Sequence, residues 1–239
     1  MVSAILWGGL AAGSLLIGFA LSGRGLSNRN VGLIMGFGGG ALISAIAYEL
    51  VPETALTGWD MVLVFGLGAL AFFAGDWIVD RRGGAERKDL SEEQTVGSGA
   101  AIFIGTLLDN VPESIILGMS LAIGGSVNVA FLAAVFVSNL PEGIAGSINL
   151  EASGYSRRTI LSMWGMLVGL SALCAGLGYV IIQRVPTLDG LYAQSFAAGA
   201  MMVMLTDAMM PEAYENGGKL VGLFAVFGFL TSAMLSVAQ

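Results

Sequence analysis

The sequence predicts an all-α integral membrane protein with eight transmembrane helices, and three observations lead to this fold class. Hydrophobic residues make up 56% of the 239 residues and charged residues only 11%, whereas soluble domains carry about 25% charged residues. The apolar residues fall into runs of about 20, the length that an α-helix needs to cross a bilayer. Lys and Arg concentrate after alternate runs, as expected of loops on the cytoplasmic side.

Short polar turns separate the apolar runs and set the boundaries of the expected spans. We expect spans at about residues 2–22, 31–53, 59–80, 98–121, 127–150, 159–182, 190–212 and 218–237. The first is expected to be a retained helix, because no basic region precedes it and no clear cleavage signal follows it. The mixed-charge segment 81–96 is expected to be a cytoplasmic loop. No separate soluble domain fits, so residues 1–239 are expected to form one transmembrane domain.

The basic residues predict the orientation of the spans. Only Arg184 follows an even-numbered span, whereas the other nine Lys and Arg residues follow spans one, three, five and seven. Because cytoplasmic loops are enriched in Lys and Arg, both termini are expected outside the cell. With such compact loops, the membrane is expected to be a plasma membrane that the chain crosses several times.

A Pro-Glu pair follows an apolar residue four times, at Pro52-Glu53, Pro112-Glu113, Pro141-Glu142 and Pro211-Glu212. These pairs fall in spans two, four, five and seven. Spans two and four run outward while five and seven run inward, so the pairs 2/7 and 4/5 are related by inverted pseudo-symmetry, which is typical of secondary transporters. A simpler interpretation is that each proline begins a helix half, although four symmetric copies argue for more than local capping.

The two central copies, residues 109–114 and 138–143, predict a cation site. An acidic residue at the centre of a membrane helix costs about 2.5–3.5 kcal/mol, and no Lys or Arg in these spans offsets that cost. Residues four apart share a helix face, so each span presents a short polar ladder. We therefore expect a bound divalent cation to supply the counter-charge, with protons replacing it in the empty site. The candidate metal-binding residues are Asp109, Asn110, Glu113, Ser138, Asn139 and Glu142.

The outer copies of the pattern predict a transport path. Glu49 and Glu53 lie near the outer end of span two, and Asp207 and Glu212 lie toward the cytoplasmic end of span seven. An acidic entrance, a central site and an acidic exit would follow in this order. For Glu53 and Glu212, a solvated carboxylate at a helix end is an equal alternative. Two other features are expected to be structural: Asp76 should anchor span three at the interface, and the methionines of residues 201–210 should fill the core.

These motifs resemble those of the ZIP (Zrt/Irt-like) family of metal transporters, whose members have eight spans with both ends outside. In that family, paired His-Asn-x-Pro-Glu-Gly motifs in spans four and five build the metal site. Residues 109–114 (Asp-Asn-Val-Pro-Glu-Ser) are similar to the first motif and residues 138–143 (Ser-Asn-Leu-Pro-Glu-Gly) to the second, while residues 47–53 and 207–213 are similar to the motifs of spans two and seven. The resemblance covers essentially the whole chain.

The resemblance implies uptake of a divalent cation such as zinc, iron or manganese toward the cytoplasm. The metal would be a transported substrate and not a cofactor, and the protein would not be an enzyme. Asp109 and Ser138 stand where the family commonly has histidine, and span six has no carboxylate. Oxygen ligands suit manganese, magnesium or ferrous iron better than zinc, and the missing span-six ligand favours a single-metal site over a binuclear one.

Two other functions remain open on the sequence. A transporter with this fold could carry another cation or a polar solute, because the motif histidines are missing. An intramembrane hydrolase could use Asp109 and Glu142 as an acid-base pair, although a hydrolase needs no inverted repeat. The expected partners are the lipid bilayer and a divalent cation, with a homodimer left open. A net charge of −7 excludes a nucleic-acid partner.

Overall fold

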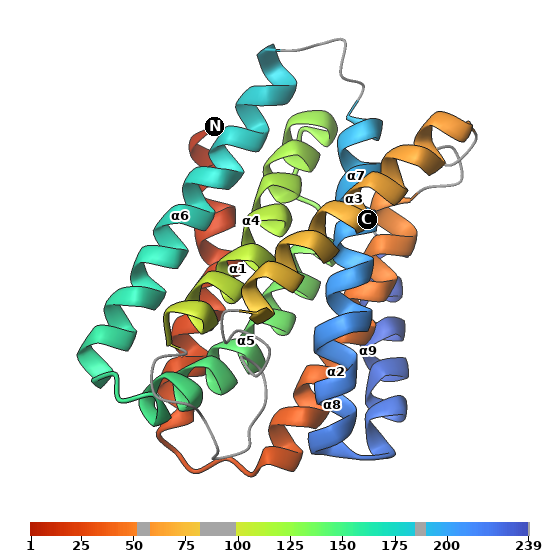
Figure 1. Cartoon of the computed structure of the whole chain (residues 1–239). Coiled ribbons are helices and arrows are strands. Elements are labelled where there is room, and N and C mark those ends of the chain that lie inside the picture. Colours follow the sequence, from red (N-terminus) through yellow and green to blue (C-terminus); the bar gives the residue numbers. More distant parts are fainter. Residues whose placement is uncertain (52–57, 82–98, 185–189, 239) are drawn as a thin grey trace.

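The computed structural model describes residues 1–51, 58–81, 99–184 and 190–238, and every regular element in these ranges is helical. The long helices form one bundle (Figure 1). The elements are α1 (Val2–Ser22), α2 (Asn28–Ala45), η1 (Ile46–Leu50), α3 (Trp59–Val79), α4 (Gly99–Gly124), α5 (Val129–Ala152), α6 (Arg157–Arg184), α7 (Leu191–Met204), η3 (Leu205–Met209), α8 (Met210–Gly217) and α9 (Leu220–Val237), where η marks a π-helical segment.

The helix lengths confirm an all-α membrane protein. Within the described residues, 7 helices are long and apolar enough to cross a bilayer, and α2 counts among them together with η1. The remaining expected span, 190–212, is divided into α7, η3 and α8, which follow one another from Leu191 to Gly217. None of these three pieces is a membrane-length helix by itself, so the count of eight spans stays a prediction. Apart from Arg81, the expected loop 81–96 lies outside the described residues.

π-helical segments lie at two of the four Pro-Glu positions. The N–H of Met210 bonds to the carbonyl of Leu205 in η3, and the N–H of Val51 bonds to the carbonyl of Ile46 in η1 at 2.9 Å. Both bonds span five residues instead of four. In η3 the cause is plain, because the following Pro211 has no N–H to donate to the carbonyl four residues earlier. Since π segments often occur at functional sites, the residues of η1 and η3 are candidates for a functional role.

The helices pack in two groups that meet along α2 and α5. One group contains α1, α4, α5 and α6, and the other contains α2, α3, α7, α8 and α9. Methionines fill the core between the groups: Met201, Met204 and Met209 are each at most 2% exposed and belong to one cluster with Phe131 of α5. The prediction that these methionines fill the core is confirmed for these three.

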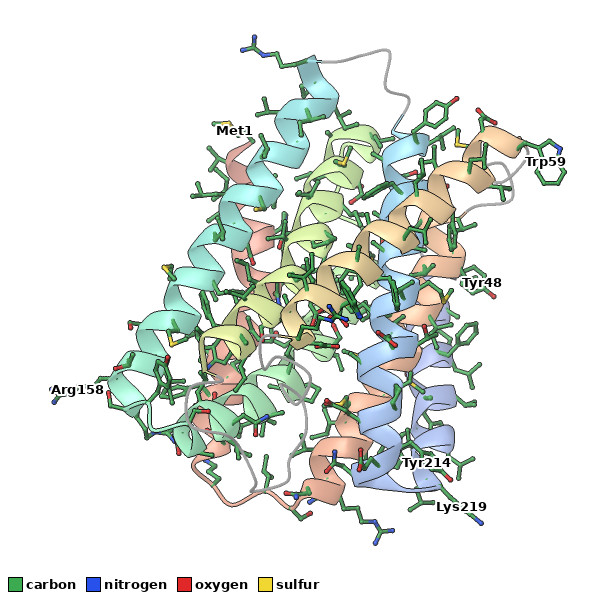
Figure 2. The ribbon with its side chains drawn as sticks, in the orientation of Figure 1. Met1, Tyr48, Trp59, Arg158, Tyr214 and Lys219 are labelled. Atoms are coloured by element: carbon green, nitrogen blue, oxygen red, sulfur yellow. The ribbon has the colours of Figure 1, made fainter. Side chains whose placement is uncertain are left out.

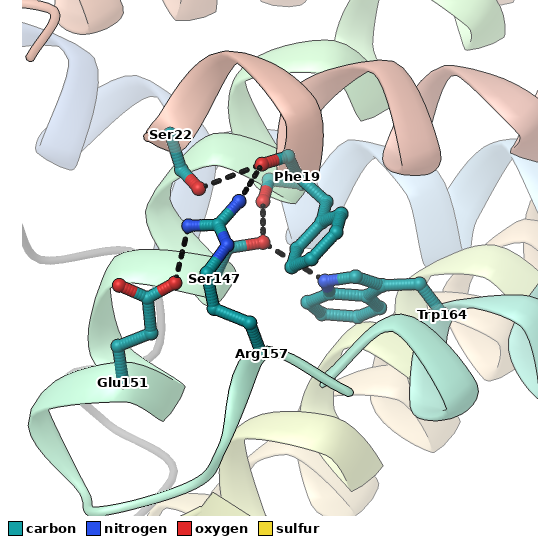
Figure 3. A network of polar contacts seen from close by, with 7 residues as sticks. Phe19, Ser22, Ser147, Glu151, Arg157 and Trp164 are labelled. Carbon is teal, nitrogen blue, oxygen red and sulfur yellow. Dashed lines mark hydrogen bonds and ion pairs between the residues drawn. The ribbon is translucent and has the colours of Figure 1, made fainter. Parts of the chain in front are cut away.

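A polar network fixes the end of α5 to α1 and α6 (Figure 3). The guanidinium of Arg157 donates to Glu151 Oε1 at 2.5 Å and to the carbonyl of Phe19 at 3.0 Å, and it lies 4.4 Å from the centre of the Phe19 ring. Deeper in the bundle, Trp164 Nε1 donates to Ser147 Oγ at 2.9 Å. Ser147 in turn donates to the carbonyl of Gly143 at 2.5 Å. The part of α5 that follows the second central motif is therefore held on two sides.

Two connections that carry basic residues lie at one end of the bundle, which is the arrangement that the predicted orientation requires. Figure 2 places Arg158, from the α5–α6 connection, and Lys219, from the α8–α9 connection, toward the same end of the bundle. Met1 and Trp59 lie toward the other end. This arrangement agrees with spans that alternate in direction.

Candidate functional site

The six predicted metal-binding residues are all buried, at the middle of two long helices. Three lie on α4 and three on α5, and each motif surrounds a proline that the helix incorporates without ending. The exposed fractions are 2% for Asp109, 1% for Asn110, 2% for Glu113, 1% for Ser138, 1% for Asn139 and 3% for Glu142. Burial of ionised carboxylates at this depth costs free energy unless a cation, a proton or hydrogen-bond donors compensate for the lost hydration. The three buried carboxylates therefore need compensating groups around them.

A hydrogen bond between α4 and α5 joins the two motifs. Asn139 Nδ2 donates to Asn110 Oδ1 at 3.1 Å, and Asn110 Nδ2 donates to the carbonyl of Thr106 at 3.0 Å. The Thr106 carbonyl therefore orients the Asn110 amide so that its oxygen faces α5. Because Glu113 and Glu142 each follow the bonded asparagine by three residues, the contact brings both carboxylate-bearing turns together.

Helix α2 closes one side of the site. A Cβ atom at Gly38 would lie 2.8 Å from Ser138 Cα, so only glycine permits α2 to approach α5 this closely at the second motif. The hydroxyl of Ser138 donates to the carbonyl of Val135 at 2.9 Å. Its oxygen therefore keeps its lone pairs for an incoming cation or hydrogen-bond donor.

The donor set limits what the site can bind. Among the described residues, no group of three or more Asp, Glu, Cys or His side chains is close enough to hold a metal ion, and the sequence contains no histidine. A cation between α4 and α5 would therefore need amide or hydroxyl oxygens besides carboxylates. Such hard oxygen ligands suit Mn²⁺, Mg²⁺ and Fe²⁺.

The predicted path residues lie on other elements and differ in exposure. Glu49, in η1, is half-buried and accepts a hydrogen bond from Asn128 Nδ2. Asp207, in η3, is exposed, and Glu212, in α8, is half-buried. Glu53 lies outside the described residues. Glu49 and Asp207 thus both lie in π-helical segments, η1 and η3.

Two polar residues, Asn128 and Asp76, have surroundings that the sequence analysis did not predict. Asn128 caps α5 and contacts Glu49; an asparagine before an apolar run predicts such a cap, but not the long-range contact. Asp76 is 2% exposed, so the prediction that it anchors α3 in the exposed membrane interface is wrong. Its position on the face of α3 that carries the buried Phe72, four residues earlier, explains its burial.

Comparison with known proteins points to zinc transporters. The chain is 32% identical over 149 residues to zinc transporter ZIP11 of Bos taurus, a match that covers 58% of this chain and 42% of that protein. It is 35% identical over 146 residues to ZIP11 of Xenopus tropicalis (57% and 43%) and 32% identical over 149 residues to ZIP11 of Homo sapiens (58% and 42%). The chain thus covers less than half of the length of these curated relatives. No family model matches the sequence. The matches support a relationship with the ZIP family.

Proposed function

We propose that this chain is a ZIP-like membrane transporter that imports divalent cations of the zinc, iron and manganese class through the buried site on α4 and α5. The observation that carries the proposal is the hydrogen bond from Asn139 to Asn110, which joins the two motifs inside the bundle. Buried Glu113 and Glu142 accompany it. The relatives, which are named zinc transporters, support the same class of cargo.

The packing supports the proposed inverted symmetry. The proposed symmetry pairs α4 with α5, α2 with α7, α1 with α6 and α3 with α9. Exchanging the members of each pair turns the contact of α1 with α5 into that of α6 with α4. It also turns the contact of α2 with α9 into that of α7 with α3. All four contacts occur among the described helices. At each contact, one glycine from each helix lies against the backbone of the partner helix. The glycine pairs are Gly18 and Gly143 for α1 and α5, Gly118 and Gly178 for α4 and α6, Gly40 and Gly228 for α2 and α9, and Gly68 and Gly199 for α3 and α7. Inverted repeats of this kind suit alternating access around a central site.

In this proposal each polar group has a defined task. Glu113 and Glu142 supply negative charge, and Asp109 adds to it one turn earlier on α4. Because no three carboxylates converge among the described residues, at most two of them bind the cation directly. The amide oxygens of Asn110 and Asn139 and the hydroxyl of Ser138 complete the oxygen donor set. Protons compete with the cation for the same carboxylates, so release is favoured on the side with the lower pH.

The path and orientation belong to the same proposal. Glu49 receives the cation at the outer end, and Asp207 and Glu212 accept it at the cytoplasmic end, where Lys219 lies (Figure 2). Both termini are then outside, and the membrane is a plasma membrane. A homodimer is compatible with the exposed apolar faces of the outer helices, which otherwise contact lipid.

One observation favours a second candidate function. Because no three acidic, Cys or His side chains converge among the described residues, the same fold could carry another cation or a polar solute. That cargo would be recognised by the asparagine amides together with only one or two carboxylates.

Uptake into proteoliposomes tests both functions. Purified protein is reconstituted and the initial uptake of Mn²⁺, Fe²⁺, Zn²⁺ and Mg²⁺ is measured for the parent and for the double variant Glu113→Gln/Glu142→Gln. Glu215→Gln is the matched control, because it removes an exposed carboxylate of α8. Saturable uptake that the double variant loses and the control keeps supports metal transport. If folded protein takes up none of the four metals, the second candidate replaces the first.

A further inference from the structure

A side-chain contact ties the π segment of α2 to the beginning of α5. Asn128 Nδ2 donates a hydrogen bond to Glu49 Oε2, across 79 residues of sequence. In the part of the chain that the structure describes, the Glu49 carboxylate takes this amide as its polar partner. No basic side chain of that part forms an ion pair with it.

The other polar atom of Asn128 is also engaged. Asn128 Oδ1 accepts the N–H of Phe131 at 2.8 Å and so caps α5. This bond fixes the direction of the amide, because only Nδ2 remains to face Glu49. The positive end of the α5 dipole lies at the same place, where an acidic side chain such as Glu49 is commonly found. Asn128 is therefore oriented by its own helix to hold Glu49.

Asn128 is aligned with the central site along α5. Asn139 follows it by 11 residues, or three helical turns, which places the two side chains on one face roughly 16 Å apart along the axis. Between them on that face lie Phe131 and Val135, which are 1% and 2% exposed. Both belong to the core cluster that contains Leu50 of η1. A polar contact at the end of the bundle thus covers an apolar layer, and the central site lies below that layer.

We propose that Asn128 is a latch that holds Glu49 and η1 against the start of α5, and so keeps the outer mouth of the path closed. A divalent cation that reaches Glu49 replaces the Nδ2–H donor on the carboxylate and releases the latch. The latch is a positioning device, since Asn128 acts through Glu49. Its assignment to the outer mouth rests on the proposed function.

Three substitutions test the contact between Asn128 and Glu49 separately from the N-cap that Asn128 provides for α5. Asn128→Ser keeps a good N-cap but is too short to reach Glu49. Asn128→Asp also keeps the cap and sets a second carboxylate against Glu49. Glu49→Ala removes the partner and leaves Asn128 in place. The matched control is Ser27→Ala, which removes the N-cap of α2, where Ser27 Oγ accepts the N–H of Asn30 at 3.3 Å, far from Glu49 in the sequence.

The readout is the accessibility of the apolar layer. Val135→Cys in a Cys174→Ser background places one thiol two turns below Asn128. A membrane-impermeant maleimide is added to intact cells and, separately, to inverted vesicles, and the rate of labelling is measured. Breaking a hydrogen bond to a charged group is expected to raise the open fraction, and with it the labelling rate in intact cells, about tenfold. Addition of Mn²⁺ should accelerate labelling of the parent but not of Glu49→Ala.

The outcomes divide clearly. Faster labelling in Asn128→Ser, Asn128→Asp and Glu49→Ala, no change in Ser27→Ala, and no further gain on combining Asn128→Ser with Glu49→Ala would support the latch. Equal labelling in all variants would overturn it, and acceleration only in inverted vesicles would overturn its place at the outer mouth. Labelling is independent of transport. If the variants open the mouth while liposomes take up no metal, the latch stands and the proposed cargo falls.

Discussion

Asn110 and Asn139, which hold the same place in the two central motifs, are hydrogen-bonded to each other at 3.1 Å. Two equivalent residues of an inverted repeat can touch only at the pseudo-twofold axis. If α4 and α5 are such repeats, this bond marks the axis, and the residues beside it have counterparts on both helices. The polar ladders of α4 and α5 then face one volume from opposite directions, which is the arrangement that a single central cation requires.

The asparagine pair should be energetically coupled. Asn110→Ala and Asn139→Ala each leave one buried polar group without its partner, which costs about 1–3 kcal/mol of unfolding free energy. The double variant should lose less than the sum, because the second substitution finds the bond already broken. Unfolding of all three variants in detergent measures the coupling. Asn30→Ala, at an exposed position, is the control, and additive losses would contradict the pairing.

Cation binding should weaken as the pH falls. Protonation of Glu113 and Glu142 removes the charge that attracts the cation, so the apparent affinity is highest at neutral pH and declines toward acidic pH. Calorimetric titration of the purified protein with Mn²⁺ across this pH range measures the effect. Glu113→Gln/Glu142→Gln should bind weakly at every pH, whereas Glu215→Gln should follow the parent. An affinity that rises on acidification would refute carboxylate ligation.

The sequence predicted the helical membrane fold and the burial of the central motifs, because each depends on local patterns. Apolar length alone marks α1, α4 and α5 as spans. The proline and carboxylate repeats indicated where polar groups enter the bundle, and burial of Glu113 and Glu142 agrees with them. The same patterns predicted methionine in the core, since an unbranched apolar side chain fills irregular gaps between helices.

The features that the sequence did not reveal depend on tertiary contacts. Asn128 is an ordinary cap in the sequence, and its contact with Glu49 exists only because η1 and the start of α5 meet. Asp76 resembled an interfacial anchor, but the packing of α3 buries it. Hydrophobic periodicity also did not predict the π segments at Glu49 and Asp207. One extra residue in a helical turn shifts the periodic pattern only slightly, and a continuous apolar run does not show that shift.

Close packing of α1 against α5 should depend on Gly143, the residue after Glu142. A Cβ atom there would lie 2.6 Å from the carbonyl oxygen of Leu15, a backbone atom that cannot move alone. Gly143→Ala is therefore expected to cost about 1–3 kcal/mol of unfolding free energy through overpacking and to reduce uptake. Gly169→Ala in α6 is the control, because no atom beyond its own stretch of helix lies within 4 Å of its added Cβ. Equal melting temperatures for the two variants would contradict this close approach.

The Arg157 network should stabilise the same helices at their end. Arg157→Ala removes the hydrogen bond to the Phe19 carbonyl, the pair with Glu151 and the contact with the Phe19 ring. Because the Arg157 and Glu151 side chains are 44% and 39% exposed, solvent screens the pair, and the ion pair itself contributes only about 0–1 kcal/mol. The carbonyl bond and ring contact should raise the total loss to about 1–2 kcal/mol. Unfolding in detergent measures this loss against Arg158→Ala, which removes a neighbouring exposed charge. Arg157→Lys should recover only part of it, since an ammonium cannot span both oxygen acceptors as the planar guanidinium does, and full recovery by lysine would reduce the network to a simple charge effect.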